Sequence, residues 1–329
     1  MQVHSSAPTR IDLAGGTIDI WPLYLFHPGA QTLNAAITIR ADAHLESRRD
    51  GRIVLRSLDT DRAVEADHLD ALPDDSALPL LVNLVRFFRV EGVTLTTTSQ
   101  SPAGAGLAGS SALTIATCGA LARWTGATYR DEDLLQIAMN VEAITIKVPT
   151  GVQDYRPALY GGIAAIELGI DGVHRVGLPV DAAGLEQRIV LAYTGAPRNS
   201  GTNNWEIMKR HLDGDRHVIE AIGRIRDTAA AMRDALAQAD WREVGRLIAD
   251  EWDNRRRLAP GVSTPEIDDL IARATRAGAT AAKVCGAGGG GCLFCYGEPD
   301  ARDAIGRALA DGGARLLEYR IDREGLLIG

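Results

Sequence analysis

The sequence predicts an α+β fold, and three observations lead to this prediction. Segments with strand-like composition occupy most of the first hundred residues, segments with helical spacing dominate the second half, and the two kinds do not alternate strictly. A chain of 329 residues, 46% hydrophobic and 24% charged, is long enough for a substantial core. A polar stretch with Gly, Asp and Pro at 169–187 indicates a boundary, so we expect lobes at 1–180 and 181–329.

The first lobe is expected to begin with strands and to continue with helices. β-branched residues between turn residues indicate strands, and apolar residues at helical spacing indicate helices. Ser110 occupies the cap position of one helix, and acidic residues at 131–133 suit the positive end of the next. We expect strands at 37–45, 53–55, 92–98 and 161–168, and helices at 79–90, 110–124 and 131–146.

The second lobe is expected to be mainly helical. One buried strand comes first, a series of helices follows, and two short strands flank a glycine run before a final helix and strand. We expect strands at 188–193, 283–285, 292–296 and 314–321, and helices at 202–211, 215–238, 241–257, 264–277 and 300–312.

Charge and composition exclude several classes of protein. Lys and Arg total 35 against 43 Asp and Glu, which gives a formal charge of −8, and a uniformly acidic surface does not attract nucleic acid. We expect no signal peptide and no membrane span, because the sequence has neither a charged segment before an apolar one at its N-terminus nor an 18-residue apolar run. The four cysteines do not indicate a disulfide framework, which favours a cytoplasmic location.

A glycine-rich loop at 102–112, with the sequence Pro-Ala-Gly-Ala-Gly-Leu-Ala-Gly-Ser-Ser-Ala, is the strongest local signal. Glycines let the backbone approach an anion closely, and the first amides of the following helix bind phosphate oxygens. Ser110 and Ser111 add hydroxyl groups suited to a phosphate or to Mg²⁺. The loop therefore predicts a phosphate-binding site.

Two other nucleotide motifs fit this loop less well. Gly104, Gly106 and Gly109 spell G-x-G-x-x-G, the dinucleotide fingerprint, but the acidic cluster at 131–133 opens a helix where the fingerprint requires the end of a second strand. The P-loop pattern is absent because no lysine follows Gly109.

Together with two further segments, this loop resembles the three motifs of the GHMP kinases, a superfamily that includes galactokinase, homoserine kinase, mevalonate kinase and phosphomevalonate kinase. The other segments are Pro-Thr-Arg-Ile-Asp-Leu-Ala-Gly-Gly-Thr-Ile-Asp at 8–19 and Lys-Val-Cys-Gly-Ala-Gly-Gly-Gly-Gly at 283–291. Within the superfamily the chain looks most like the D-glycero-D-manno-heptose 7-phosphate kinase group. Features that carry this resemblance are Ile146-Lys147-Val148, Gly151-Val152-Gln153-Asp154, Gly161-Gly162, Thr194-Gly195 with Arg198, and Arg255 to Arg257.

The resemblance implies a fold and an activity. The expected fold is the two-lobed GHMP kinase fold, with an N-terminal lobe like ribosomal protein S5 domain 2 and an α+β sandwich as C-terminal lobe. The expected activity is ATP-dependent phosphorylation of a hydroxyl group on a sugar or sugar phosphate, most like heptose 7-phosphate, with Mg²⁺. The implied partner is this small molecule, and a homodimer is compatible with the sequence.

Asp154 and Arg10 are the predicted catalytic residues. The resemblance puts a catalytic aspartate at Asp154, and a carboxylate can orient the acceptor hydroxyl and take its proton. Arg10 falls where the family carries Lys or Arg; pairing with Asp154 would keep that carboxylate ionised. The resemblance also makes Glu142 a ligand of Mg²⁺, together with Ser111 or, as the alternative, Ser110.

The remaining predicted site residues follow the three motifs. ATP would contact Pro102, Gly104, Gly106, Leu107, Ala108, Gly109, Ser110 and Ser111. The acceptor would contact Gly16, Thr17, Asp19, Asn34 and Arg198, the last as a fork for an acceptor phosphate. A glycine loop with Gly286, Gly288, Gly289 and Gly290 would pass close to the site.

The sequence also departs from the heptose kinase pattern. That group usually has three glycines and then Thr-Asp in its first motif, whereas here two glycines are present and Ile18 stands where the threonine would be. The stretch 20–26 is also unexpectedly apolar for a loop that faces a sugar. The acceptor can therefore differ, and two alternatives stay open: a kinase or decarboxylase of the mevalonate branch, and a pseudokinase that senses sugar and ATP.

Overall fold

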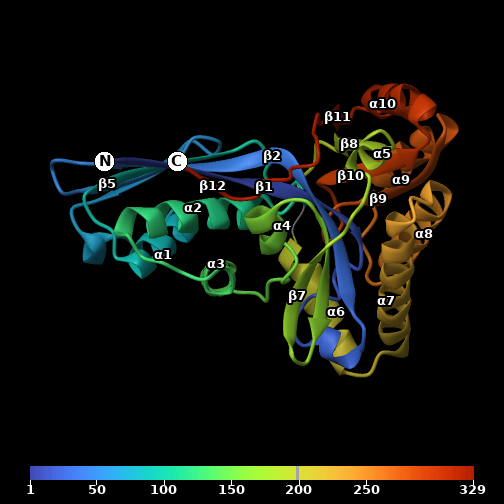
Figure 1. Ribbon diagram of the computed structural model, residues 1–329, viewed down its shortest axis with the longest axis horizontal. Coiled ribbons are helices and arrows are strands. Elements are labelled where there is room, and N and C mark those ends of the chain that lie inside the picture. Colours follow the sequence, from blue (N-terminus) through green and yellow to red (C-terminus); the bar gives the residue numbers. More distant parts are fainter. Residues whose placement is uncertain (198–199) are drawn as a thin grey trace.

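The computed structural model describes residues 1–197 and 200–329, and the described chain forms two β-sheets with helices packed against them (Figure 1). The first sheet has the order β12-β1-β2-β5-β3-β4, with β6 and β7 added beside β2; the second has the order β11-β8-β10-β9. The strands of the first sheet are β1 (Gln2–Ala14), β2 (Gln31–Ser47), β3 (Ile53–Ser57), β4 (Arg62–Ala66), β5 (Val93–Ser99), β6 (Ile163–Gly169), β7 (Gly172–Gly177) and β12 (Leu327–Ile328). Those of the second are β8 (Ile189–Tyr193), β9 (Ala279–Val284), β10 (Cys292–Gly297) and β11 (Arg315–Leu316).

Helices cover the two sheets separately. The first sheet is covered by α1 (Pro79–Phe88), α2 (Gly109–Thr125), α3 (Asp131–Ile146) and α4 (Tyr155–Tyr160), which lie beneath it in Figure 1. The later helices are α5 (Ala182–Glu186), α6 (Ser200–Leu212), α7 (Arg216–Ala237), α8 (Trp241–Arg255), α9 (Pro265–Arg276) and α10 (Arg302–Asp311). Short 3₁₀ turns are η1 (Leu23–Phe26), η2 (Leu69–Ala71) and η3 (Pro299–Ala301).

The long strand β2 organises the first sheet. It pairs with β1 over most of its length, while its first half also pairs with β6 and its second half with β5. The β1 ladder is irregular between Pro8 and Thr9 and again between Asp12 and Ala14. Such irregularities bend a strand and redirect its side chains, and here they lie within the first sequence motif.

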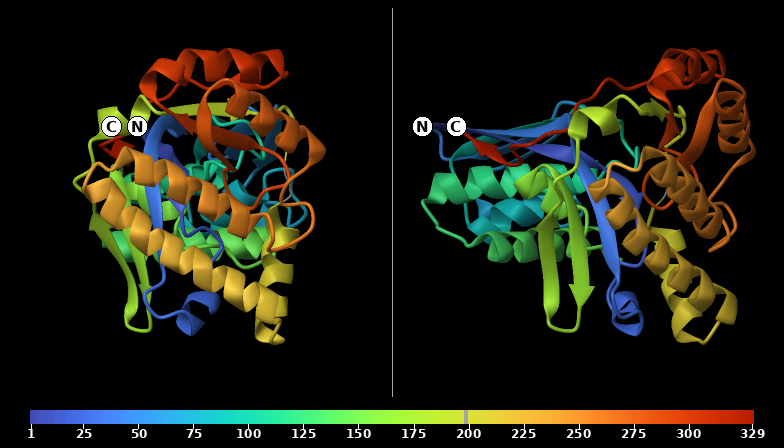
Figure 2. Two further views of the ribbon diagram at one scale, coloured as in Figure 1. Left: turned by 90° about the vertical axis from the view of Figure 1, so that its right-hand side faces the viewer. Right: turned by 45° about the vertical axis from the view of Figure 1, so that its right-hand side comes forward.

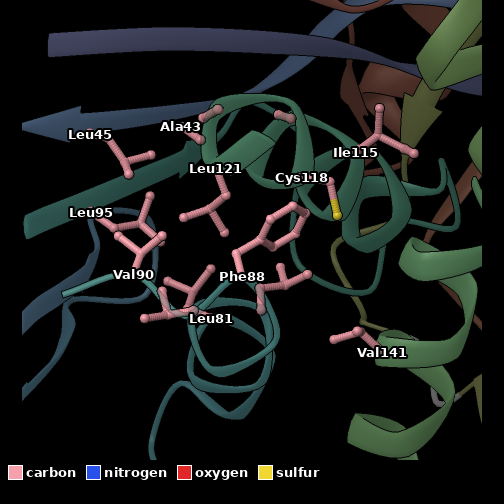
Figure 3. Close-up of a cluster of buried hydrophobic side chains, with 14 of the residues drawn as sticks. Ala43, Leu45, Leu81, Phe88, Val90, Leu95, Ile115, Cys118, Leu121 and Val141 are labelled. Carbon is pink, nitrogen blue, oxygen red and sulfur yellow. The ribbon is translucent and has the colours of Figure 1, made fainter. Parts of the chain in front are cut away.

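The core under the first sheet is apolar and closely packed. Figure 3 shows Leu45 and Leu95 from the sheet facing Phe88 of α1 and Leu121 of α2. The central helix α2 has a buried, Ala-rich stretch on its inner side, which lets it lie close to the strands, and it ends at Gly126 in a left-handed cap. This packing fixes the start of α2 against the sheet.

Three helices of the second half, α7, α8 and α9, begin with side-chain caps. Asp215, Asp240 and Thr264 each accept a hydrogen bond from a backbone amide in the first turn of α7, α8 and α9, which satisfies an otherwise unpaired donor. Helices α7 and α8 lie side by side, as both views in Figure 2 show. Among the described residues, none of the helices combines the length and apolar character needed to cross a membrane.

The end of the chain returns to its beginning. Strand β12 pairs with β1, and the two termini lie close together in Figures 1 and 2. The hydrophobic clusters also combine residues from both halves, for example Ile11 and Leu33 with Ile248 and Phe294. The predicted lobe boundary between residues 180 and 181 therefore stays a prediction.

The α+β prediction is confirmed, and most expected elements are present. The expected cap at Ser110 is wrong: α2 begins at Gly109 after Ala108, and no side chain caps it. The strand expected at 314–321 is limited to Arg315–Leu316, because the chain then leaves the second sheet and pairs Ile321 with Ile37 in the first. The segment expected to be a polar boundary contains β7 and α5.

Candidate active site

The glycine-rich loop between β5 and α2 lines a cleft of about 330 Å³. Its backbone takes left-handed conformations at Gly104, Gly106 and Ala108, with φ of 67°, 79° and 61°. The predicted ATP-binding residues that line the cleft are Pro102, Gly104, Gly106, Ala108, Gly109, Ser110 and Ser111. The helix α2 begins in this lining, and the unpaired amides of a helix start can bind phosphate oxygens.

Leu107 is buried and does not line this cleft. Its carbonyl group accepts a hydrogen bond from the Arg10 backbone amide at 3.0 Å. Leu107 thus attaches the loop to β1 from behind.

Glu142 of α3 lies at one end of this cleft, beside the start of α2. The hydroxyl of Ser111 donates to Glu142 Oε2 at 3.1 Å, and both side chains are nearly buried. Burial raises the pKa of the Glu142 carboxyl, the nearby Ser110 and Tyr155 hydroxyls lower it, and the Asp154 charge raises it further. A buried carboxylate beside another carboxylate favours a positive partner.

These residues fit Mg²⁺ by their chemistry. Mg²⁺ prefers hard oxygen donors and is usually held by one or two carboxylates together with phosphate oxygens and water. Ser111 and Glu142 supply such donors in the cleft that the phosphate loop also lines. Within the described ranges no group of three or more His, Cys, Asp or Glu side chains could hold a metal by itself, so the phosphates would have to complete the ligand set.

Arg10 joins Asp154 to the phosphate loop. Its Nε and Nη2 atoms donate to Asp154 Oδ1 at 3.0 and 2.6 Å, and its Nη1 donates to the Gly106 carbonyl at 2.7 Å. Burial opposes the charge of this guanidinium, but the Asp154 and Asp12 carboxylates outweigh that effect and raise the pKa of Arg10. Asp154 keeps about a quarter of its side chain exposed (27%) and lines the cleft.

A second, smaller cleft of about 40 Å³ lies on the other side of Asp154. Its lining comes from distant parts of the chain and consists of Arg10, Thr17, Asp19, Ile20, Gly151, Gln153, Asp154, Asn204, Arg255, Gly286 and Ala287. Asp154 lines both clefts. A space of this size is close to that of one water molecule, so it can admit only the end of a larger molecule.

Asp19 is a buried carboxyl in the small cleft. Its Oδ2 accepts the backbone amide of Gln153 at 3.1 Å, and its Oδ1 accepts Gln153 Nε2 at 3.3 Å. Burial and the Asp154 charge raise the pKa of Asp19 to about 7, although the Gln153 amide lowers it. A Cβ atom at Gly151 would lie 2.1 Å from Asp19 Oδ2, which explains why a glycine stands there.

Hydrogen-bond acceptors in the small cleft lack partners. The Oε1 atom of Gln153 and the Oδ1 atom of Asn204 are buried without a hydrogen bond. Buried polar atoms are normally paired. The cleft therefore suits a molecule that brings hydroxyl donors.

A cluster of buried charges lies behind the small cleft. Lys283 Nζ is 3.5 Å from Asp12 Oδ1 and 3.7 Å from Glu251 Oε1, and Arg255 Nη1 donates to Asp12 Oδ2 at 2.8 Å. Burial alone would raise the pKa of Asp12, but the charges of Lys283 and Arg255 hold it below its ordinary value. The cluster joins β1, α8 and β9.

The glycine run passes against both clefts. A Cβ atom at Gly291 would lie 2.6 Å from the Ala105 carbonyl of the phosphate loop, and Cys292 donates its amide to the same carbonyl. Gly286 lines the small cleft, whereas Gly288 and its neighbours Gly289 and Gly290 pack against the backbone of Val262, Gly261 and Ala196. Close approach of backbones accounts for the glycines.

Two predicted acceptor residues that the structure describes, Asn34 and Gly16, do not line either cleft. Asn34 is buried on β2 and donates to Thr32 Oγ1 at 3.0 Å. Gly16 lies against the Asp12 and Arg255 pair, whose atoms a Cβ would meet at 2.2 Å. Arg198 lies outside the described residues. Thr17 and Asp19 do line the small cleft, and the roles of all five stay predictions.

Sequence reasoning missed several residues of the two linings. Gln153 and Arg255 belong to segments that carry the resemblance, but no role followed from them. Asn204 gave no signal, because an asparagine in a polar helix is ordinary. The turn residue Asp59 also lines the larger cleft, and nothing in its local sequence distinguishes it.

The chain matches two family models, "GHMP kinases N terminal domain" at residues 77–162 and "GHMP kinases C terminal" at 232–315. It is 28% identical over 335 residues to a D-glycero-alpha-D-manno-heptose 7-phosphate kinase of Campylobacter jejuni, covering 98% of each chain. It is 28% identical over 352 residues to a mevalonate kinase of Thermococcus sibiricus, covering 100% of this chain and 98% of the relative.

A solved structure has the same fold. The D-glycero-D-manno-heptose 1-phosphate kinase from Bacteriodes thetaiotaomicron superposes with a TM-score of 0.80 and 26% identity, covering 99% of this chain and 98% of that one. The motifs, the two-sheet fold and both family matches agree, and the chain therefore belongs to the GHMP kinases.

Proposed function

We propose that this protein transfers the terminal phosphoryl group of ATP to a hydroxyl group of a sugar phosphate of the heptose phosphate kind. GHMP kinases use ATP as phosphoryl donor. The observation that carries the proposal is the position of Asp154 between the phosphate-loop cleft and the small polar cleft. An acceptor hydroxyl in the small cleft and the ATP phosphates in the larger cleft would therefore both lie next to Asp154.

Asp154 and Arg10 would carry out the proton and charge chemistry. Asp154 would orient the acceptor hydroxyl and accept its proton as the oxygen attacks the terminal phosphorus. Arg10 holds Asp154 Oδ1 and the Gly106 carbonyl at the same time. It would fix the carboxylate relative to the phosphate loop.

Ser111 and Glu142 would hold Mg²⁺ with the ATP phosphates. When bound, Mg²⁺ supplies positive charge that neutralises the phosphate oxygens. Glu142 lies close enough to Asp154 for their charges to interact. The start of α2 would bind the phosphate oxygens through its backbone amides.

The small cleft supports an acceptor rich in hydroxyl groups. The hydrogen-bond acceptors of this cleft are Asp19, Gln153 Oε1 and Asn204 Oδ1. The last two lack partners. Both arginines of the cleft are already paired, Arg10 with Asp154 and Arg255 with Asp12. The sugar end of the acceptor would therefore enter this cleft, and its phosphate would lie outside.

Mevalonate is the competing acceptor, because mevalonate kinases are also among the similar proteins. It carries a carboxylate and fewer hydroxyl groups than a heptose. A carboxylate in the small cleft would meet Asp19 and Asp154 and find no unpaired cation among the described lining residues. The lining therefore favours the sugar.

The test is ADP release from Mg-ATP by the purified protein with a panel of acceptors. The panel contains D-glycero-D-manno-heptose 7-phosphate, the corresponding 1-phosphate, galactose and mevalonate. Turnover with a heptose phosphate, and none with mevalonate, is the expected result. Turnover with mevalonate alone would contradict the proposed acceptor, and a protein that binds ATP but releases no ADP with any of these acceptors would favour sensing.

A further inference from the structure

The turn after β1 has a strained residue next to the acceptor cleft. Thr17 has φ of 78°, and it lines the cleft together with Asp19. This left-handed region is unfavourable for a β-branched side chain, which is found there only when its surroundings hold it. Ile18, between the two, is completely buried in a hydrophobic cluster, so the turn is fixed in the core on that side.

Arg255 holds the other side of the turn. Its Nη2 atom donates to Thr17 Oγ1 at 3.1 Å and also to the Gly286 carbonyl of the glycine run. Its Nη1 atom donates to Asp12 Oδ2 at 2.8 Å. One guanidinium therefore joins the strand before the turn, the turn itself and the opposite wall of the cleft.

Glu251 adds a second attachment from the same face of α8. It lies one helical turn before Arg255, and its Oε1 atom accepts the Gly15 amide at 3.0 Å. Gly16 lies between these two attachments, where a Cβ atom would come within 2.2 Å of the Arg255 guanidinium. Side chains that are locked by their own partners can hold a neighbouring site in one geometry.

We propose that Arg255 is a positioning residue that keeps Thr17 in its left-handed conformation and thereby sets the place of Asp19 in the acceptor cleft. The inference rests on the proposed function for its kinetic consequence. The hydrogen bonds of Arg255 to Asp12, Thr17 and Gly286 do not reach the phosphate loop, and the residue does not line the ATP cleft. Its loss is therefore expected to weaken acceptor binding without weakening ATP binding.

The first test compares Arg255→Lys, Thr17→Gly and their combination with the wild type. Lysine keeps the buried charge but cannot make the forked contacts. With heptose 7-phosphate as acceptor, Arg255→Lys is expected to raise the acceptor KM about tenfold and leave the ATP KM within about twofold. The double variant should have an acceptor KM about threefold lower than that of Arg255→Lys alone, because glycine takes a positive φ without strain.

The matched control is Arg256→Lys, the next residue along the chain. Arg256 is exposed and pairs only at the surface with Asp253, so this change should leave both KM values unaltered. Equal rises in acceptor and ATP KM for Arg255→Lys would overturn the inference. So would a double variant no better than Arg255→Lys alone, because relief of strain at residue 17 would then be irrelevant.

A second pair of variants leaves the buried arginine intact and decides the matter where Arg255→Lys does not fold. Thr17→Val removes the hydroxyl that Arg255 holds and keeps a β-branched residue at a positive φ. It is expected to raise the acceptor KM about threefold more than Thr17→Gly does, because both variants lose the hydroxyl but only valine keeps the strain at residue 17. Equal effects of the two changes would overturn the inference.

Hydrogen exchange of residues 15–19 provides a readout that needs no acceptor. We expect these amides to exchange about tenfold faster in Arg255→Lys and in Thr17→Val than in the wild type and the control, with the phosphate loop unchanged. Unchanged exchange at 15–19 overturns the inference even where the wild type accepts no sugar phosphate. Lack of turnover by the wild type, by contrast, contradicts only the proposed function.

Discussion

The two clefts that meet at Asp154 are built in different ways. The larger one is lined mainly by one continuous segment, the glycine-rich loop and the first turn of α2, which presents backbone groups and small hydroxyl side chains. The smaller one is lined by single residues from β1 and its turn, the segment before α4, α6, α8 and the glycine run. The donor side is thus a local structure, and the acceptor side is an assembly of distant parts.

This difference separates phosphate binding, which needs only a local structure, from recognition of the acceptor, which needs the whole fold. A loop before a helix start binds phosphate wherever it occurs, so its chemistry does not depend on the rest of the chain. The acceptor cleft depends on buried charges such as Asp12, Lys283 and Glu251, whose positions are set by the whole fold. Changes on the two sides should therefore affect ATP and acceptor separately, except at the residue they share.

Asp154→Asn should have the largest effect, because this residue lines both clefts. Asparagine keeps the size of the side chain but cannot accept a proton, so kcat is expected to fall about 10³-fold. ATP binding, measured by calorimetry, should change little because the phosphate loop remains. The exposed Asp74→Asn serves as control. A kcat within a few-fold of wild type would remove Asp154 from the catalytic role.

Glu142→Gln should affect only the donor side. The Mg²⁺ concentration needed for half-maximal rate is expected to rise about tenfold or more, since a carboxylate ligand is lost. The acceptor KM should stay the same, because Glu142 does not line the small cleft. Titration of Mg²⁺ at saturating acceptor measures this, with the exposed Glu220→Gln as control. An altered acceptor KM with unaltered Mg²⁺ dependence would contradict the separation of the two sides.

The same contrast explains what the sequence could predict. The lining at 102–111 could be recognised because its residues are contiguous and their chemistry is local. Arg10, Glu142 and Asp154 were identified through the resemblance, and the structure brings them together, although their roles stay predictions. The departure at Ile18 indicated only that the acceptor can differ, and the positive φ of its neighbour, Thr17, is revealed by the folded backbone.

Residues such as Asn204 could not be predicted, for a physical reason. Asn204 reaches the small cleft because α6 packs, through Met208, against Ile20 and against Leu23 of η1. Such a contact depends on tertiary packing between segments far apart in the chain, which no local pattern encodes. The fold class and the element types follow from local patterns, whereas the acceptor cleft does not.

Asp19 should give the acceptor side a pH dependence of its own. Its pKa is raised to about 7 by burial and by Asp154, so it is mostly protonated at pH 6 and mostly ionised at pH 8. If ionised Asp19 accepts the acceptor hydroxyls, the acceptor KM should fall about tenfold across this range. Asp19→Asn should abolish the change, and a fall that persists in the variant would assign it to another group.

The same residue makes a stability prediction with a definite sign. Because the folded pKa of Asp19 lies above its ordinary value, the folded protein holds this proton more tightly than the unfolded chain does. The resulting stability is complete below about pH 4 and is lost as the pH rises through 7. Relative to Asp19→Asn, the wild type should therefore lose about 4 kcal/mol between pH 4 and 8 in denaturant titrations. A constant difference would contradict the raised pKa.

The smallest expected effect concerns a pair of histidines, one directly after η1 and the other in α6. His27 and His211 are buried with their Nε2 atoms 2.8 Å apart, so one must donate and the other accept. Burial, His211 and Arg226 lower the pKa of His27 to about 4, although Asp227 raises it. The pair stabilises the fold above about pH 6.5, and this contribution is lost as the pH falls through 4.

His27→Gln should reduce this acid sensitivity, because an amide can still hydrogen-bond to His211 but does not titrate. Between pH 7 and 5, we expect the wild type to lose about 1 kcal/mol more stability than the variant. His174→Gln, which changes an exposed histidine, should retain the wild-type slope. His211 and Asn204 both belong to α6. In the wild type, the acceptor KM should therefore rise as stability is lost at acid pH, whereas the ATP KM should not. Parallel changes in both KM values would mean that the two clefts are coupled through more than Asp154.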